Sequence, residues 1–473
     1  MEQADGILCF KVPPKYCKIT EQDLTEDPAS ALSKLLYNRS LTHSYLNDTR
    51  SALSDATQSL NFNPKNYMSY FQRGNILFEL RSYRPAYSDF MEVAKITKSA
   101  RLVKQKAEAT RRAILQQALF ESLKSQTNPQ KPKQVPKIAQ QESTLDFDFD
   151  HFKVEDALRL IGELKNQRML NQNCVSRMIN KIREMHEFLP NIVSIEKPKT
   201  GNVIKVVGDT HGQFQDLLYI FERFGNPTPE NPYLFNGDYV DRGSQGLEIL
   251  LTLFSWKIAC PKAIYFNRGN HETDLMNNPY GFENECIAKL SPELFRKFSN
   301  MFGTLPVGHI IGGKVLVVHG GLFSDESVTV DTIQGLIRYG QPPESGPMND
   351  ILWSDPMERP GHAPSPRGVT QTFGPDVTEK FLKANNLELL IRSHQVQEEG
   401  YLVQHNGKCI TVFSAPNYIG RIGNKGAVVF ISFAEDGSLN PPKFEQFTAQ
   451  PIPPNFRPMK FSNLGNLFMR ISS

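Results

Sequence analysis

Six short apolar runs follow residue 200 of this 473-residue chain, and five of them end in a cluster of Asp, Asn or His residues. The five are "VIKVV" (203–207), "YLF" (233–235), "AIYF" (263–266), "VLVV" (315–318) and "LLI" (389–391), and the sixth is "ITVF" (410–413). Short apolar runs bounded by glycine and polar residues are typical of buried strands. The runs therefore predict an α/β domain built around packed sheets, which we place at residues 153–473.

The clusters supply the donor atoms of a metal centre. A single Asp-x-His turn is more typical of a polar turn than of a metal site, but five clusters of this kind favour a shared function, because ligands gather beyond the carboxyl ends of strands. Oxygen and nitrogen donors without thiolates suit manganese, iron or zinc. Two such ions about 3.5 to 4 Å apart can hold a phosphate and activate water. The candidate ligands are Asp209, His211, Asp238, Asn270, His319 and His394, with Asp238 as the natural bridge.

The motifs "GDTHGQ", "NGDYVDRG" and "RGNHE" stand in this order and resemble those of the calcineurin-like metallophosphoesterases. "HGGL", "WSDP", "RSHQ" and "SAPNY" make the chain similar to the PPP family of serine/threonine protein phosphatases. "QPPESGPM" (341–348), "QFTAQP" (446–451) and a preceding region that resembles tetratricopeptide repeats make it similar to the type 5 branch of that family. The resemblance implies a central β-sandwich flanked by helices, and hydrolysis of phosphoserine and phosphothreonine in phosphoprotein substrates. It also implies two divalent metal ions as cofactors, whose identity (manganese, iron or zinc) stays open.

The resemblance also implies a role for each site residue. Asp209, His211 and Asp238 would hold one ion, and Asp238, Asn270, His319 and His394 the other. His271, oriented by Asp241, would be the general acid that protonates the leaving oxygen. The residues that would approach the phosphate are Arg242, Asn270, His271, Arg367 and Tyr418.

Three departures from the family pattern leave these roles intact. Ile419, Gly420 and Arg421 follow "SAPNY" where the family usually has Cys and polar residues, Gln395 replaces a Glu, and Asn267 replaces a Leu. A nuclease or cyclic-nucleotide phosphodiesterase would share the first three motifs, and a pseudophosphatase would act through other parts of the chain. The later motifs and the complete ligand set favour a protein phosphatase over both. His309, His405 and Trp256 lie outside the motifs and are expected to be ordinary packing residues, whereas Trp353 is expected to brace the rim of the site.

The N-terminal part of the chain repeats with a period of 34 residues. Arg39 recurs as Arg73, and Asp55 as Asp89, while small residues recur at Ser40 and Gly74 and at Ala52 and Ala86. This period resembles tetratricopeptide repeats, although two unrelated helical hairpins are the alternative. We expect an all-α repeat domain at 28–124 and a Pro- and Lys-rich linker at 125–152, in which "DFDFDHF" (146–152) would be a strand or docking segment.

The type 5 resemblance implies that the repeats take a peptide or protein partner and also cover the active site. Of the residues that bind the acidic C-terminal peptides of heat-shock chaperones, Asn38 matches. Met68 and Gln72 stand where Lys and Arg are expected, so binding of such peptides is doubtful. The apolar face of residues 463–471 is a candidate contact for the repeats.

Composition excludes several other classes of function. The net charge of +3 does not favour nucleic acid as a partner, and no apolar run is long enough for a membrane span. The six cysteines are scattered and lack metal-binding spacing. With no segment typical of a signal peptide, we expect a cytoplasmic and/or nuclear protein.

Overall fold

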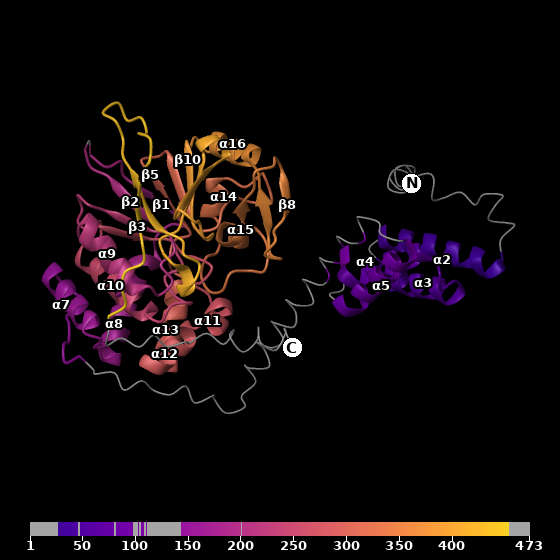
Figure 1. Ribbon diagram of the computed structural model, residues 1–473, viewed down its shortest axis with the longest axis horizontal. Helices are drawn as coiled ribbons and strands as arrows, with labels where there is room; N and C mark the ends of the chain where they lie inside the picture. Colours follow the sequence, from indigo (N-terminus) through magenta and orange to yellow (C-terminus); the bar gives the residue numbers. More distant parts are fainter. Residues whose placement is uncertain are drawn as a thin grey trace. The chain divides into compact units, whose positions relative to one another are not determined.

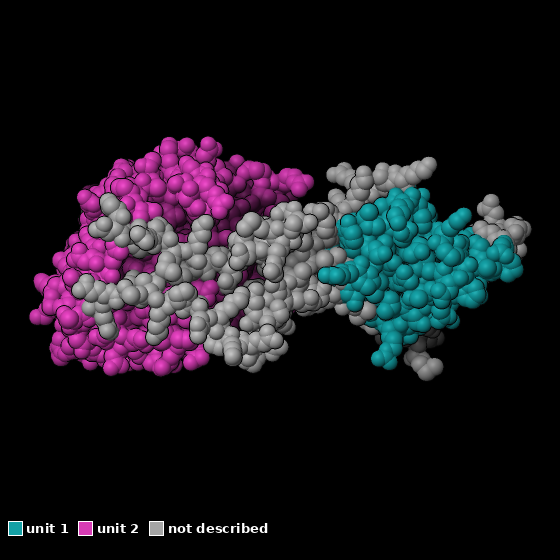
Figure 2. Space-filling view, turned by 60° about the horizontal axis from the view of Figure 1, so that its bottom comes forward, with its two compact units in different colours: residues 1–130 teal, residues 131–473 magenta. Residues whose placement is uncertain are grey.

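The computed structural model describes residues 27–45, 48–79, 82–97, 143–199 and 201–453, together with residues 103, 106, 107 and 110. The chain divides into two compact units, residues 1–130 and 131–473, which are coloured teal and magenta in Figure 2. Figure 1 shows helices in the first unit, and both strands and helices in the second. In the part of the chain that is described, no helix combines the length and apolar character that crossing a membrane would require.

The first unit contains two helix pairs that repeat one another. They are α2 (Pro28–Tyr45) with α3 (Thr49–Phe62), and α4 (Tyr67–Glu79) with α5 (Tyr83–Thr97). Arg39 binds the Asp55 carboxylate through two hydrogen bonds of 2.6 and 2.7 Å, and Arg73 binds Asp89 in the same way at 2.8 Å. Because the same two-pronged ion pair recurs at the same spacing, the helices are repeats of one unit, and the prediction of an all-α repeat domain is confirmed.

The second unit is built around two facing sheets and a smaller third one. The six-stranded sheet has the order β1 (Ile192–Ile195), β5 (Gly308–Ile311), β6 (Val315–Val318), β10 (Leu389–Arg392), β12 (Cys409–Val412), β11 (Tyr401–Gln404). The five-stranded sheet has the order β14 (Lys443–Phe447), β13 (Gly426–Ile431), β2 (Ile204–Val207), β3 (Tyr233–Phe235), β4 (Ile264–Phe266). The third has the order β7 (Asp355–Pro356), β9 (Gln371–Phe373), β8 (His362–Pro364). All six apolar runs are therefore strands, as predicted.

Helices cover the outer faces of the two large sheets (Figure 1). Those that share one apolar core with β2, β3 and β4 are α7 (Val154–Lys165), α8 (Gln172–Glu187), α9 (Phe214–Phe224), α10 (Gly246–Ala259), α12 (Phe282–Lys289) and α13 (Pro292–Phe302). Those on the six-stranded sheet are α14 (Val330–Gln334), α15 (Pro347–Trp353) and α16 (Pro375–Ala384). The short helix α11 (Asp274–Tyr280) follows β4.

Side chains alternate between the two faces of each sheet. Val206 and Leu234 face the six-stranded sheet, whereas Val207 and Phe235 face the helices. Two sheets that bury a common apolar layer between helical layers form the expected β-sandwich. His309, His405 and Trp256 are buried, as expected of packing residues.

Residues 143–152 belong to the second unit. Phe147, Phe149 and Phe152 are buried together, with ring centroids 5.3 to 6.4 Å apart. Arg177 on α8 donates to the Phe147 carbonyl at 2.8 Å and to the Asp146 carboxylate. The segment has no strand pairing among the described residues and turns at residues 149–151, so it is a docking segment. The expected linker therefore ends before residue 143 and not at residue 152. The reason is that the three phenylalanine side chains pack into the core, while Asp146 and Asp150 pair with cationic side chains of α8.

Candidate metal centre

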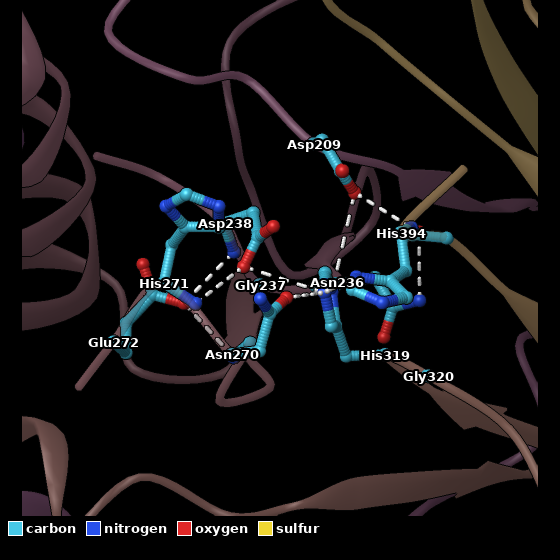
Figure 3. Close-up of polar contacts among 12 residues, drawn as sticks. Asp209, Asn236, Gly237, Asp238, Asn270, His271, Glu272, His319, Gly320 and His394 are labelled. Atoms are coloured by element: carbon cyan, nitrogen blue, oxygen red, sulfur yellow. Dashed lines mark hydrogen bonds and ion pairs between the residues drawn. The ribbon is translucent and has the colours of Figure 1, made fainter. Parts of the chain in front are cut away.

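The five polar clusters meet at one end of the sandwich. Asp209 and His211 follow β2, Asp238 follows β3, Asn270 follows β4, and His319 and His394 follow β6 and β10 of the opposite sheet. All six side chains are at least nine-tenths buried. Figure 3 shows Asp238, Asn270 and His319 turned toward one another, with Asp209 and His394 beside them.

The backbone of these loops is strained in order to aim the side chains. His211, Asp238 and His394 have φ of 41°, 53° and 71°, in the left-handed region that residues with a Cβ seldom adopt. The loops also approach closely, because a Cβ on Gly237 would lie 2.6 Å from the backbone of Gly269. Strain held by tight packing at one point is typical of a functional site.

His319 sits among oxygen atoms that can only accept hydrogen bonds or bind a cation, and beside a ring nitrogen of His394. Its Nδ1 donates to the Asn236 carbonyl at 2.8 Å. Its Nε2 faces Asn270 Oδ1 at 2.9 Å, Asp238 Oδ1 at 3.3 Å and His394 Nδ1 at 3.3 Å. A positive charge, either a proton or a metal ion, must lie between these atoms. Burial opposes the charged ring, but the Asp238 carboxylate outweighs it and raises the pKa of His319 to about 9.

A second position lies on the other side of Asp238. His211 Nδ1 donates to the Val240 carbonyl at 2.9 Å, so its Nε2 lone pair faces Asp209 Oδ2 at 3.6 Å and Asp238 Oδ2 at 3.5 Å. Burial lowers the pKa of His211 to about 3, which keeps this ring neutral and able to bind a cation. A second ring nitrogen that donates to a carbonyl is the arrangement seen in metal-binding histidines.

The donor set fits divalent cations. Carboxyl and imidazole donors form two groups that share Asp238, namely His211–Asp238–His271 and Asp238–His319–His394. The amide oxygen of Asn270 lies beside His319 of the second group. His394 Nε2 is buried with no hydrogen-bond partner among the described residues. The oxygen and nitrogen lone pairs on the two sides of the Asp238 carboxylate face one another, and a divalent cation on each side would satisfy them.

The general-acid candidate His271 is held by a carboxylate. Its Nδ1 lies 2.7 Å from Asp241 Oδ2, and Asp241 also accepts from Asn277 Nδ2 at 3.0 Å and from the Phe282 N–H at 2.8 Å. Burial disfavours the imidazolium, but Asp238 and Asp241 outweigh it and raise the pKa of His271. The geometry favours a protonated ring with fixed orientation. Sequence reasoning missed Asn277, which no motif marks.

Comparison with known proteins decides the family. Residues 203–398 match the calcineurin-like phosphoesterase family model. The chain is 40% identical over 468 residues to serine/threonine-protein phosphatase 5 of Homo sapiens, covering 98% of this chain and 92% of that protein. It is 39% identical over 461 residues to serine/threonine-protein phosphatase T of Trypanosoma brucei brucei, covering 96% and 94%. This chain belongs to the serine/threonine-protein phosphatase 5 family.

A solved structure agrees with this assignment. A protein serine/threonine phosphatase from Saccharomyces cerevisiae, described as similar to human phosphatase PP5, is 39% identical and superposes with a TM-score of 0.60, covering 64% of this chain and 99% of that one. The phosphatase reading of the motifs is thereby confirmed, and family membership implies divalent metal ions. The comparisons support an active phosphatase and give no support to the pseudophosphatase alternative.

The phosphate-binding candidates of this phosphatase lie around the metal positions in different ways. The Arg242 guanidinium lies 3.8 Å from the centre of the Tyr280 ring, and the Tyr418 ring lies 5.1 Å from that of His211. The Arg367 guanidinium is fixed by two hydrogen bonds, which it donates to Asp355 Oδ2 at 2.5 Å and to the His394 carbonyl at 3.0 Å. Arg367 is thus fixed to the backbone of His394, one of the metal-ligand candidates. The Trp353 ring lies 5.5 Å from that of His394, consistent with a bracing role.

Sequence reasoning assigned no role to the carboxylates that hold the loops. Glu272 accepts from the backbone N–H groups of Gly269, Asp238 and Tyr239 at 2.8 to 2.9 Å, so it ties the β3 loop to the β4 loop. Asp355 holds Arg367 and also accepts from Arg392 at 2.8 Å. Both lie inside quoted motifs, "RGNHE" and "WSDP", and this was the only available signal of their importance.

Two of the departures from the family pattern have visible consequences. Gln395 accepts a hydrogen bond of 3.0 Å from Arg392, so an amide oxygen serves where the family usually has a carboxylate. Ile419 has φ of 52°, a strained conformation for a β-branched residue, and its side chain is exposed beside Tyr418.

Proposed function

We propose that this phosphatase hydrolyses phosphoserine and phosphothreonine at a two-metal centre, with Asp209, His211 and Asp238 at one position, and Asp238, Asn270, His319 and His394 at the other. The observation that carries the assignment is the Asp238 carboxylate, whose two oxygens face His319 Nε2 and His211 Nε2 at 3.3 and 3.5 Å. Manganese, iron or zinc suits these donors. When bound, the ions neutralise phosphoryl charge and lower the pKa of water.

The side chains of the protein supply positioning and protons. Arg242 and Arg367 bind the phosphate oxygens, for which the planar guanidinium is well suited. Tyr418 and Asn270 approach the same oxygens. Water that has given up one proton to the solvent attacks phosphorus in line with the leaving oxygen, and His271 gives its Nε2 proton to that oxygen as the P–O bond breaks. Asp241 keeps His271 oriented through the 2.7 Å bond to Nδ1.

The substrates are phosphoproteins, and the repeat unit regulates access to them. The described repeat helices end at Thr97, and the described part of the catalytic unit begins at residue 143. The long connection between them keeps the repeats at high effective concentration near the active site, which supports autoinhibition. The predicted apolar contact at 463–471 lies outside the described residues. The four described cysteines, Cys174, Cys260, Cys286 and Cys409, are free thiols, which supports a cytoplasmic or nuclear location.

The test is a comparison of three substrates with the full chain. A phosphoserine peptide, an aryl phosphate and a cyclic nucleotide are each assayed with added manganese and after removal of metal by a chelator. We expect the peptide and the aryl phosphate to be hydrolysed only with metal, and the cyclic nucleotide to be spared. Hydrolysis of the cyclic nucleotide alone would identify a phosphodiesterase, and turnover of none of the three would refute the proposal.

A further inference from the structure

A chain of three polar side chains crosses the sandwich behind the metal centre. Asn236 follows β3, Asn267 follows β4, and His309 lies in β5 of the opposite sheet. His309 Nδ1 lies 2.7 Å from Asn267 Oδ1, and Asn267 Nδ2 donates to Asn236 Oδ1 at 2.7 Å. The exposed fractions of Asn236, Asn267 and His309 are 0%, 0% and 1%. A polar connection of this kind joins two sheets that otherwise meet through apolar side chains.

The side-chain amides of Asn236 and Asn267 each donate two hydrogen bonds from Nδ2 and accept one at Oδ1. Asn236 Nδ2 donates to the Val318 carbonyl at 2.8 Å and to Ser393 Oγ at 2.9 Å. Asn267 Nδ2 makes a second bond, of 3.0 Å, to the Val317 carbonyl. Burial lowers the pKa of His309 well below its usual value, so the ring is neutral and donates from Nδ1. A buried network whose asparagine amides are all hydrogen-bonded is rigid, because every displacement breaks a bond that water cannot replace.

The network ends on metal-ligand candidates of the six-stranded sheet. The backbone carbonyl of Asn236 accepts the 2.8 Å hydrogen bond from His319 Nδ1. Ser393, which Asn236 holds, precedes His394 and donates its backbone N–H to the His319 carbonyl at 3.0 Å. The acceptor behind a metal-binding histidine fixes the orientation of its ring and its basicity. The position of Asn236 therefore determines where His319 Nε2 points.

We propose that Asn267 and His309 are positioning residues that tie the two sheets together behind His319 and so set the metal affinity of the position formed by Asp238, Asn270, His319 and His394. A leucine at residue 267 would have no donor for Asn236 and no acceptor for His309. Asn267 thus joins the two sheets through directed hydrogen bonds. The inference rests on the proposed metal assignment for its starting point.

The deciding experiment measures bound manganese and not activity. Full-length wild type and the Asn267→Leu variant are equilibrated with buffered free manganese over a wide range, and the metal per chain is determined. Wild type is expected to bind two equivalents. In Asn267→Leu, one equivalent should need about 10- to 100-fold more free manganese, the usual effect of removing a supporting residue. The other equivalent, at Asp209 and His211, should be unchanged, and kcat should recover at saturating manganese.

Matched variants separate positioning from general stability. His309→Asn keeps a donor near the position of Nδ1 and should retain the wild-type manganese affinity. His309→Leu should lower the affinity for the same manganese equivalent that Asn267→Leu affects. Thr411→Val is the control, because Thr411 lies buried in β12 and its Oγ1 has no hydrogen-bond partner among the described residues. We expect Thr411→Val to bind metal as wild type does.

Three results would overturn the inference. These are unchanged binding of both equivalents in Asn267→Leu and His309→Leu, an equal shift of both equivalents that follows the melting temperature, or no rescue by His309→Asn. Wild type that binds fewer than two equivalents would refute the metal assignment as well. Wild type that binds two equivalents but does not hydrolyse the phosphopeptide would refute the proposed function alone and leave the positioning role standing.

Discussion

Removal of the His271 side chain tests the proposed chemistry, because this ring lies beside both a carboxylate and a proposed metal position. Its Nδ1 is 2.7 Å from Asp241 Oδ2, and its ring centroid is 4.7 Å from that of His211. The bond from His271 to Asp238, of 2.9 Å, comes from the backbone N–H. The change His271→Ala therefore deletes the acid and keeps the backbone contact that supports Asp238.

We expect kcat on a phosphoserine peptide to fall by about two to four orders of magnitude, the usual contribution of a general acid. This corresponds to about 3 to 5 kcal/mol of transition-state stabilisation. An aryl phosphate should lose much less, because its leaving group is stable as an anion and needs little protonation. The ratio of the two losses, measured at saturating manganese, reports on proton donation.

His151 offers a matched control outside the site. It forms the same type of pair with Asp148, at 2.7 Å, but its side chain is 83% exposed. His151→Ala should leave both rates unchanged. Equal losses on the two substrates in His271→Ala would refute the role of general acid. Loss of one manganese equivalent would show that His271 is instead a ligand, since it also groups with His211 and Asp238.

Three further predictions concern other parts of the chain. Burial lowers the pKa of Lys257 to about 8 in the folded chain. Between pH 8 and about 10.4 the unfolded chain therefore binds more protons than the folded chain, and the free energy of unfolding should rise with pH by up to about 3 kcal/mol. Lys257→Met should lack this rise in chemical denaturation at pH 7.5 and 9.5, and an identical pH dependence would contradict the shift. An acidic Glu-Glu-Val-Asp peptide should bind weakly or not at all by calorimetry, whereas Met68→Lys with Gln72→Arg should gain affinity; micromolar binding by wild type would overturn this prediction. A chain that begins at residue 143 should have the melting temperature of the full-length catalytic unit and hydrolyse a small phosphopeptide several-fold faster than the full chain. A chain that begins at residue 153 should have a lower melting temperature. Equal rates for the full chain and the chain from residue 143 would restrict the repeats to docking.

The sequence predicted the parts of the fold whose signal is local. The strands β2, β3, β4, β6, β10 and β12 are short apolar runs, buried on both faces, and the six metal-ligand candidates follow directly after five of them. Strands β11 and β14 are partly exposed, and their sequences carry no comparable run. Their existence depends on edge pairing, which composition does not encode.

The supporting contacts could not be predicted, because each depends on a partner that is remote in sequence. Asn267 stood out as a departure from the family, but its partner His309 lies in the other sheet and looked like an ordinary packing residue. Asp355 is unremarkable until the fold brings Arg367 and Arg392 to it. The docking of Phe147, Phe149 and Phe152 likewise needs the α8 surface, so alternation alone did not decide between strand and docking segment.

The order of strands in the five-stranded sheet has a consequence for how the chain is made. Strand β13 lies between β2 and β14, with Val428 paired to Val207, so β2 has one open edge until residues 426–431 emerge from the ribosome. At about 5 to 20 residues per second, that interval lasts roughly 10 to 45 s. During this time the exposed N–H and C=O groups of β2 can pair with other chains. Because β13 is the last of these strands but one in the chain, the five-stranded sheet is completed only after most of the catalytic unit has been made.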